Sequence, residues 1–370
     1  MFRPRTYVRP VDVAIPYVFV AIALVLGAIV APGFLDSNHM SSMAQTASYI
    51  GIIAIGQTLV LLIGGIDLSI PYTVNLAAVL LAGYQANGMS STRDIATVLG
   101  VGACIGLVNG LGVALLDINP LVMTLGMNSI LQGITLIYTH GSPIGQAPVF
   151  VTTVSTGWWG HIPWVAVLWI GLTIVVTLAL AFTTFGRSIY AVGANRRATE
   201  LSGLPVKRTV VLAYVISGLA GALGGILLVG YSGQAYLAMG DEFLLPSIAV
   251  VVIGGTSIFG GKGSYLQTAG GALLITVIES ILISVDVGES GQNIMYGVII
   301  LATAYLGQVA ITGHQIRLGV LNSSLGAFRG WLTPARSADE AMRPESSNEP
   351  RSSIPDDLGA QKRKKGNGDE

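Results

Sequence analysis

Apolar runs about as long as a membrane is thick follow one another along most of the chain, with few polar residues between them. The hydrocarbon core of a bilayer is about 30 Å thick, and about 20 residues of helix cross it. Only a helix or a closed barrel satisfies the backbone polar groups there. With 52% apolar and 10% charged residues, the chain does not have the composition of a water-soluble globule. The sequence predicts an all-α, polytopic membrane helical bundle of about ten transmembrane helices.

The chain divides by composition into one membrane domain and two flanking pieces. We expect a short cytoplasmic N-terminus over residues 1–12 and a transmembrane domain over residues 13–313. Residues 314–370 are too polar to bury a core, which predicts a disordered cytoplasmic tail. The candidate membrane segments run at about 13–31, 46–65, 71–88, 95–116, 120–138, 163–183, 209–230, 244–260, 266–285 and 292–311.

Basic residues mark one side of the membrane. With the N-terminus in the cytoplasm, 18 of the 19 Lys and Arg residues fall inside and only Arg93 falls outside, as the positive-inside rule demands. The external loop 139–162 has no charge, and Trp158, Trp159 and Trp164 lie near its end, as in an interfacial aromatic belt. We therefore expect a multi-pass protein of the inner membrane with both termini cytoplasmic. The cytoplasmic regions would be 1–12, the turns near 66–70, 117–119 and 261–265, the loop 184–208 and the tail.

A polar turn at residues 64–69 separates two of the apolar segments. An ionised Asp67 would be costly against lipid, so we expect it to cap a broken helix, face a cavity or lie at the cytoplasmic boundary. Asp67 and Ser69 could equally serve only to cap the next helix. Sparse uncharged polar groups suit a neutral hydroxylated solute better than an ion, although each could instead join helices. The residues predicted to line a substrate pathway are Gln57, Asp67, Ser69, Asn75 and Thr124.

Residues 193–205 predict a short helix in the longest cytoplasmic loop. Asn195 can cap its start, while Gly203 and the proline that follows can end it. Arg196 and Arg197 come in the first turn and Glu200 comes late. This order opposes the helix dipole, and each charge costs a few tenths of a kcal/mol. We expect this helix to dock into a partner, the alternative being a basic loop that only follows the positive-inside rule. Its predicted docking residues are Asn195, Arg196, Arg197, Glu200, Leu201 and Gly203.

The glycine-rich segment 254–264 superficially resembles a phosphate-binding loop. Thr256 stands where such a loop needs its first glycine, and Gly263 stands where Ser or Thr must follow the lysine. Any ATP is therefore expected to be bound and hydrolysed by a partner, and we predict no cofactor. The four histidines are far apart and no nucleophile has an evident base, so neither a metal site nor an enzyme activity is predicted. A net charge of zero gives no reason to expect nucleic acid.

Glu279 is the second acidic residue at mid-membrane depth. It would suit proton coupling, which makes an ion-coupled secondary transporter of a small polar solute the alternative function. One carboxylate without an evident partner is a weak relay, however, and interior hydrogen bonding is the favoured interpretation. A secondary transporter usually needs several buried ionisable groups, and only Asp67 and Glu279 are candidates.

Glycines recur at four-residue spacing in two segments. Gly102, Gly106 and Gly110 form one series, and Gly221 and Gly225 form another. Small residues let membrane helices approach closely, so the spacing predicts a tightly packed bundle and says nothing about substrate.

Four pairs of motifs follow one another over roughly residues 45–310, and in this order they resemble the ribose-type permeases of ABC importers. That branch also includes permeases for xylose, other sugars and autoinducer-2. After Ser69 the chain reads Ile70-Pro71-Tyr72, which departs from the Val-Gly type continuation of the family. The motifs are Gly56-Gln57-Thr58-Leu59 with residues 64–69; Asn119-Pro120 with Thr124-Leu125-Gly126-Met127; Phe185-Gly186-Arg187 with Leu201-Ser202-Gly203; and Gly254-Gly255-Thr256-Ser257 with Gly260-Gly261.

The resemblance implies an ABC importer permease fold and a set of partners. Two copies of the chain, as a homodimer in the bilayer, would surround a central path and work with two cytosolic ATPase subunits and a periplasmic sugar-binding protein. The helix at 195–203 would be the coupling helix, seated in a groove of the ATPase. ATP-driven closure would tilt the two halves between outward-facing and inward-facing states. The implied function is import of a sugar or similar small hydroxylated solute.

Overall fold

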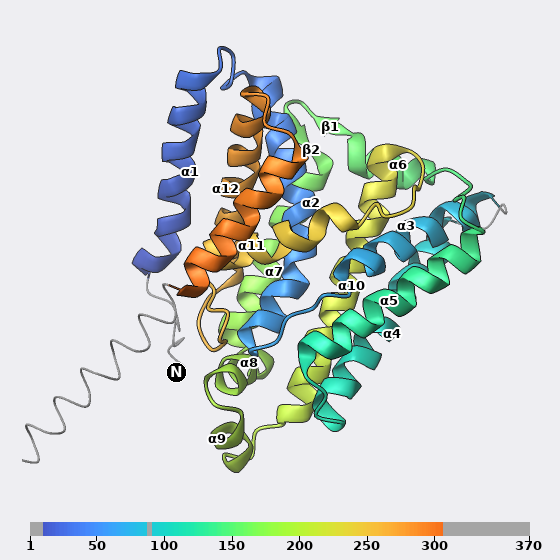
Figure 1. The fold of residues 1–370 in the computed structure, drawn as a ribbon, viewed down its shortest axis with the longest axis vertical. Helices are drawn as coiled ribbons and strands as arrows, with labels where there is room; N and C mark the ends of the chain where they lie inside the picture. Colours follow the sequence, from blue (N-terminus) through green and yellow to red (C-terminus); the bar gives the residue numbers. More distant parts are fainter. Residues whose placement is uncertain (1–9, 87–90, 306–370) are drawn as a thin grey trace, which may run out of the picture. The chain divides into compact units, whose positions relative to one another are not determined.

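The computed structural model describes residues 10–86 and 91–305, and nearly all of its regular structure is helical (Figure 1). The tail predicted at 314–370 and most of the N-terminal segment 1–12 lie outside the described residues. A further helix covers residues 289–305. The named elements are α1 Pro10–Val30, α2 Ser37–Leu62, α3 Ile70–Ala86, α4 Ser91–Leu115, α5 Pro120–Thr139, α6 Val149–Thr156, β1 Trp158–Trp159, β2 Ile162–Pro163, α7 Trp164–Phe182, α8 Thr184–Ala194, α9 Arg196–Leu201, α10 Val206–Ser232, η1 Asp241–Phe243, α11 Leu244–Ile253 and α12 Tyr265–Ser284.

Seven helices in the described part of the chain are long and apolar enough to cross a membrane: α1, α2, α4, α5, α7, α10 and α12. The polytopic helical bundle is thus confirmed, whereas the count of about ten is not. Helix α3 has 17 residues, and α11 has 10, which is only about 15 Å of helix. The prediction of a span at 244–260 is wrong beyond Ile253, because Gly254 and Gly255 end the helix there and Gly255 has a φ of 103°.

Helix α10 lies at the centre of the bundle and contacts α2, α3, α4 and α6. Helix α2 is buried along nearly its whole length, with 94% of its most apolar window enclosed, whereas α1, α5 and α7 expose most of theirs. The exposed faces of these outer helices are apolar, as lipid contact requires. The chain therefore buries its polar groups on α2, α3 and α10 and leaves its apolar helices outside.

Close packing of α4 on α10 confirms the prediction made from the glycine spacing. A Cβ at Gly106 would lie 2.1 Å from the carbonyl oxygen of Tyr214, and one at Gly102 would lie 2.5 Å from that of Gly218. On another face of α10, a Cβ at Gly225 would lie 2.2 Å from the carbonyl oxygen of Val74 in α3. Side chains at these positions would separate the helices, so only glycine permits the observed approach.

The predicted uncharged loop 139–162 contains structure that the sequence did not reveal. Helix α6 packs against α10 and α7, and β1 and β2 form a two-residue antiparallel hairpin. Trp159 and Trp164 stack with their ring centroids 5.9 Å apart, and both are more than 40% exposed. Exposed stacked indoles are typical of a membrane interface.

The turns at 117–119 and 261–265 and the loop 184–208, all predicted to be cytoplasmic, lie near α8 and α9 (Figure 1), whereas the turn predicted near 66–70 runs into the bundle, where Asp67 is buried. Arg196 forms a salt bridge with Asp117 in the turn before α5. The amide of Gly261 donates to the carbonyl oxygen of Leu62 at 2.9 Å, and a Cβ at Gly193 would touch both groups. The grouping of the first three segments fits the predicted topology, and the side of the membrane that they face stays a prediction.

Candidate functional site

The turn between α2 and α3 is buried and highly connected. Helix α2 ends where Gly64 takes a φ of 82°, and the amides of Gly64 and Gly65 donate back to Leu61 and Val60 at 2.8 and 2.9 Å. A Cβ at Gly65 would lie 2.7 Å from the Tyr214 hydroxyl of α10. The chain therefore turns tightly at this point, inside the bundle and against α10.

Asp67 lies in this turn, is only 2% exposed and is fully engaged by hydrogen bonds. Its Oδ1 accepts from the amide of Ser69 at 3.0 Å and from the Ser69 hydroxyl at 2.6 Å, and its Oδ2 accepts from the Ser217 hydroxyl of α10 at 2.6 Å. The Asn109 amide of α4 donates to the Ser69 hydroxyl at 2.8 Å. Asp67 thus does more than cap α3, because it joins the turn to α10, and through Ser69 to α4.

Thr124 connects α5 to the same turn. Its hydroxyl accepts from the amide of Leu68 at 3.0 Å and donates to the carbonyl oxygen of Pro120 at 2.8 Å. The predicted start of α5 is confirmed, because the Asn119 side chain accepts from the amide of Leu121 at 2.9 Å with Pro120 in the first turn. Three of the five predicted pathway residues therefore belong to one network around residues 62–69.

Gln57 and Asn75 stand apart from that network. Both are 0% exposed, and in the described part of the chain neither side-chain amide has a hydrogen-bond partner. An enclosed amide without a partner costs on the order of 1–3 kcal/mol. That Gln57 and Asn75 line a substrate pathway stays a prediction. All five predicted pathway residues are enclosed, so none of them meets solvent in this arrangement.

Helix α9 has the ends that its sequence predicts. The Asn195 side chain accepts from the amide of Ala198 at 2.9 Å, and Gly203 follows the helix with a φ of 75°. Thr199 is the only buried residue of α9, and Leu201 is 84% exposed. The docking of α9 into a partner stays a prediction, which the exposure of Leu201 and the charges opposed to the helix dipole leave open to test.

Two links join α9 to the rest of the bundle. Arg196 reaches Asp117 at 3.2 Å, but both side chains are exposed, so the pair contributes at most about 1 kcal/mol. The second link is a backbone junction where Gly193 of α8 packs on Leu62 and Gly261, close to the start of α9. The Tyr190 hydroxyl adds a hydrogen bond of 2.9 Å to the carbonyl oxygen of Gly263. The glycine-rich segment 254–264 therefore packs between α8 and the α2–α3 turn.

Glu279 has a partner inside the bundle. The hydroxyl of Tyr296, on the helix at 289–305, donates a hydrogen bond to its carboxylate. Interior hydrogen bonding, which the sequence favoured over a proton relay, is therefore what the structure shows for this residue.

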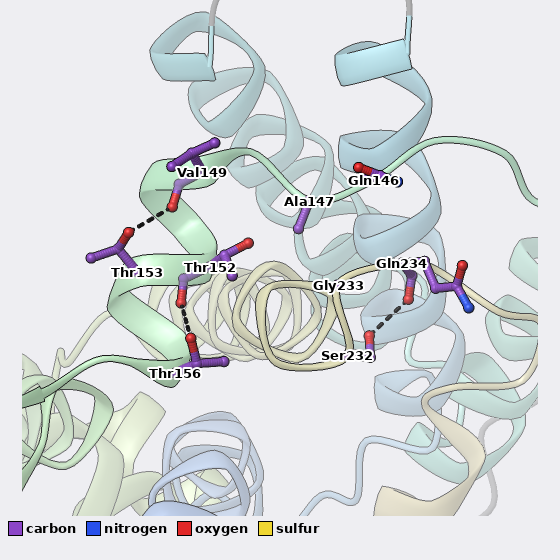
Figure 2. A pocket seen from close by; sticks show the side chains of 9 residues that line it. All are labelled: Gln146, Ala147, Val149, Thr152, Thr153, Thr156, Ser232, Gly233 and Gln234. Atoms are coloured by element: carbon purple, nitrogen blue, oxygen red, sulfur yellow. Dashed lines mark hydrogen bonds between the residues drawn. The ribbon is translucent and has the colours of Figure 1, made fainter.

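A polar hollow of about 540 Å³ opens where α6 meets the end of α10 (Figure 2). Gln146 and Gln234 pair across an isolated bridge, and the Ser232 hydroxyl donates to the carbonyl oxygen of Gln234 at 2.7 Å. Sequence reasoning missed this hollow because its two walls lie about 80 residues apart in the chain. Its lining residues are Gln146, Ala147, Val149, Thr152, Thr153, Thr156, Ser232, Gly233 and Gln234.

Comparison of the sequence with known proteins finds transport proteins. Residues 39–304 match the family described as the permease component of the branched-chain amino acid transport system. The ribose import permease protein of Escherichia coli (strain K12) is 36% identical over 294 residues, covering 75% of this chain and 89% of that protein. That of Bacillus subtilis (strain 168) is 32% identical, covering 79% and 91%. The autoinducer 2 import system permease protein of Photorhabdus laumondii is 31% identical, covering 80% and 91%. No solved structure matches.

The apolar helical bundle and the family match define a multi-pass membrane permease. The chain belongs to the family of ABC importer permease components, in the branch of the ribose and autoinducer-2 import permeases. The resemblance drawn from the four pairs of motifs is therefore confirmed.

Proposed function

We propose that this permease subunit carries a sugar or similar small hydroxylated solute into the cytoplasm by ATP-driven alternating access. A separate cytosolic ATPase subunit hydrolyses the ATP, and a periplasmic binding protein delivers the solute. Two copies of the chain surround the path. The protein lies in the inner membrane, with both of its termini in the cytoplasm. The names of the relatives support the class of solute.

The observation that carries the proposal is the exposure of α9. Arg196, Arg197 and Glu200 all lie on its exposed surface, and Leu201 projects from its end. The ATPase subunit supplies an apolar groove for Leu201 and opposite charges for the charged residues of α9. These contacts offset the unfavourable order of charges along the helix dipole. Asn195 and Gly203 fix the two ends of this docking helix.

Movement of α9 reaches the interior through two contacts. Gly193 transmits it to Leu62 and the segment 254–264, while the pair formed by Arg196 and Asp117 transmits it to the start of α5. Both contacts lead to residues 62–69, the first directly and the second through Thr124. Binding of ATP by the partner thereby biases two packings of one bundle.

The test is a charge exchange on α9. The double variant Arg197→Glu with Glu200→Lys should insert normally but lose most stimulation of the partner ATPase, because the countercharges of the groove then repel it. The matched control is Arg187→Glu, a change of an exposed basic residue on α8. Co-purification of the ATPase subunit and its ATP turnover are measured in detergent. Co-purification and turnover equal to those of the control would contradict docking through α9.

A further inference from the structure

A polar group that sequence reasoning missed surrounds the first turn of α3. The Gln132 amide of α5 donates to the Tyr72 hydroxyl at 2.8 Å, and the Tyr72 amide donates to the Asn128 side chain at 3.4 Å. Gln132 is exposed and Asn128 is half-buried. This face of α5 therefore presents the Gln132 amide at the molecular surface, beside the hydroxyl of Tyr72, a residue that is only 8% exposed.

The segment after α10 brings carboxylates to the same place. A Cβ at Gly240 would lie 1.9 Å from the carbonyl oxygen of Pro71, so only glycine lets η1 pack on the first turn of α3. The next residue, Asp241, is exposed and lies within electrostatic reach of Tyr72. Glu242 follows it, and Tyr236, 45% exposed, lies within reach of Glu242.

The carboxylates are close enough to repel one another. Partial desolvation, followed by the like charges of Glu289 and Asp241, raises the pKa of Glu242, which lies outside the seven candidate membrane spans. A ligand that donates hydrogen bonds relieves this repulsion. An anionic solute is disfavoured because Asp241, Glu242 and Glu289 repel it, and the choice of a neutral solute over a cationic one rests on the proposed function.

The opposite side of α5 has a different character. Ile130, Ile134 and Tyr138 line an apolar hollow of about 620 Å³ together with Cys104 of α4. Polar side chains are costly against lipid and apolar ones are not. The face with Gln132 carries the exposed Leu125 and Leu136 beside its amides, whereas Ile130 and Ile134 bring no amide to the hollow. We assign the first face to the path or to a second copy and the second face to lipid.

We propose that Tyr72, Gln132 and Asp241 form a solute-contact site on the translocation path, suited to a neutral polyhydroxylated molecule. The amide donates to and accepts from hydroxyl groups, the carboxylate accepts from two neighbouring hydroxyls, and Tyr236 offers an aromatic face to the C–H side of a ring. The site rests on the proposed function and names the residues that the solute meets. The enclosed Gln57 and Asn75 contact the solute only after the helices have moved.

Accessibility to a water-soluble thiol reagent tests which face of α5 is wet. Cys104 is the only cysteine, so Cys104→Ser gives a background free of thiols. Gln132→Cys and Ile130→Cys are then labelled in the complete transporter in proteoliposomes with a charged methanethiosulfonate. Gln132→Cys should react at least about tenfold faster than Ile130→Cys, and added ribose, delivered by the binding protein, should slow the labelling of Gln132→Cys. Equal rates at both positions would overturn the site.

Transport by conservative variants provides the second test. Tyr72→Phe and Asp241→Asn should each lower the amount of sugar carried per ATP hydrolysed by about tenfold, as the loss of a hydrogen bond to a hydroxyl predicts. Tyr138→Phe, in the apolar hollow, is the control. A wild-type complex that carries no sugar with ATP would refute the proposed function and the site with it. A wild-type complex that transports, with both variants equal to the control, would refute the site alone.

Discussion

Replacing Gly193 with alanine should separate ATP hydrolysis from transport. Gly193 lies in α8, two residues before the cap of α9, at the junction with Leu62 and Gly261. The added Cβ would lie 1.9 Å from the Leu62 carbonyl oxygen and 2.5 Å from the Gly261 amide. Ordinary contact begins near 3.4 Å, so the carbonyl must retreat by about 1.5 Å. Movement of α9 is then no longer transmitted to the α2–α3 turn.

The free energy of unfolding should fall by about 1–3 kcal/mol. Overpacking costs about 1–3 kcal/mol, and the hydrogen bond between Gly261 and Leu62 contributes about 1 kcal/mol. Alanine in a helix recovers about 1 kcal/mol relative to glycine. Gly171→Ala in α7 is the matched control, because a Cβ there has nothing within 4 Å. Only the higher helix propensity of alanine then changes the free energy of unfolding.

The assay compares the two variants in the assembled transporter. We expect Gly193→Ala to retain the ATPase subunit, since Asn195 and the exposed side of α9 are unchanged, while sugar uptake per ATP hydrolysed falls at least about fivefold. Melting in detergent confirms that the variant is folded. Uptake per ATP equal to that of Gly171→Ala would refute transmission through this junction.

Two other substitutions follow from the contacts. Asn195→Ala removes the hydrogen bond to the Ala198 amide and about 1 kcal/mol of helix stability. Helix α9 should then fray, and the variant should insert into the membrane but co-purify less ATPase subunit. Unchanged affinity of the permease for the ATPase subunit would argue against a role of the cap. Gly106→Leu places a side chain against the Tyr214 carbonyl oxygen, whereas Gly100→Leu meets nothing within 4 Å. The first should lower the melting temperature in detergent well below that of the second, and similar temperatures would contradict tight packing of α4 on α10.

Local chemistry made several elements predictable. The apolar runs identify the seven long helices because lipid demands apolar surface wherever a helix faces outward. The caps of α5 and α9 follow from Asn119, Asn195 and Gly203, whose side chains or backbone freedom act within a few residues. The glycine spacing of α4 likewise predicts close packing, although it does not name α10 as the partner.

Polar residues paired inside the bundle misled the sequence analysis. Helix α2 begins at Ser37 rather than near 46, because its first turns pair with the chain around α6 and the hairpin instead of facing lipid. The Ser41 hydroxyl donates to the His161 carbonyl oxygen at 2.6 Å, and the Gln45 amide donates to that of Ser155 at 2.8 Å. Hydropathy counts such residues against a membrane helix whether or not they have partners.

Long-range contacts decide the candidate sites, and these are not readable from one sequence. Asp67 meets Ser217 across 150 positions, and Tyr72 meets Gln132 across 60. Residue type made Asp67 conspicuous because a buried carboxylate is costly. Gln132 gave no comparable signal, since an amide on a membrane helix is equally suited to joining helices.

Uptake of radiolabelled sugars into proteoliposomes distinguishes an ATP-driven importer from an ion-coupled carrier. Proteoliposomes carrying this chain with its ATPase subunit and binding protein are supplied with or without internal ATP, at zero proton gradient. We expect uptake that requires both ATP and the binding protein. Uptake by the chain alone, driven by a proton gradient, would contradict it and would point instead to an ion-coupled carrier using Asp67 and Glu279.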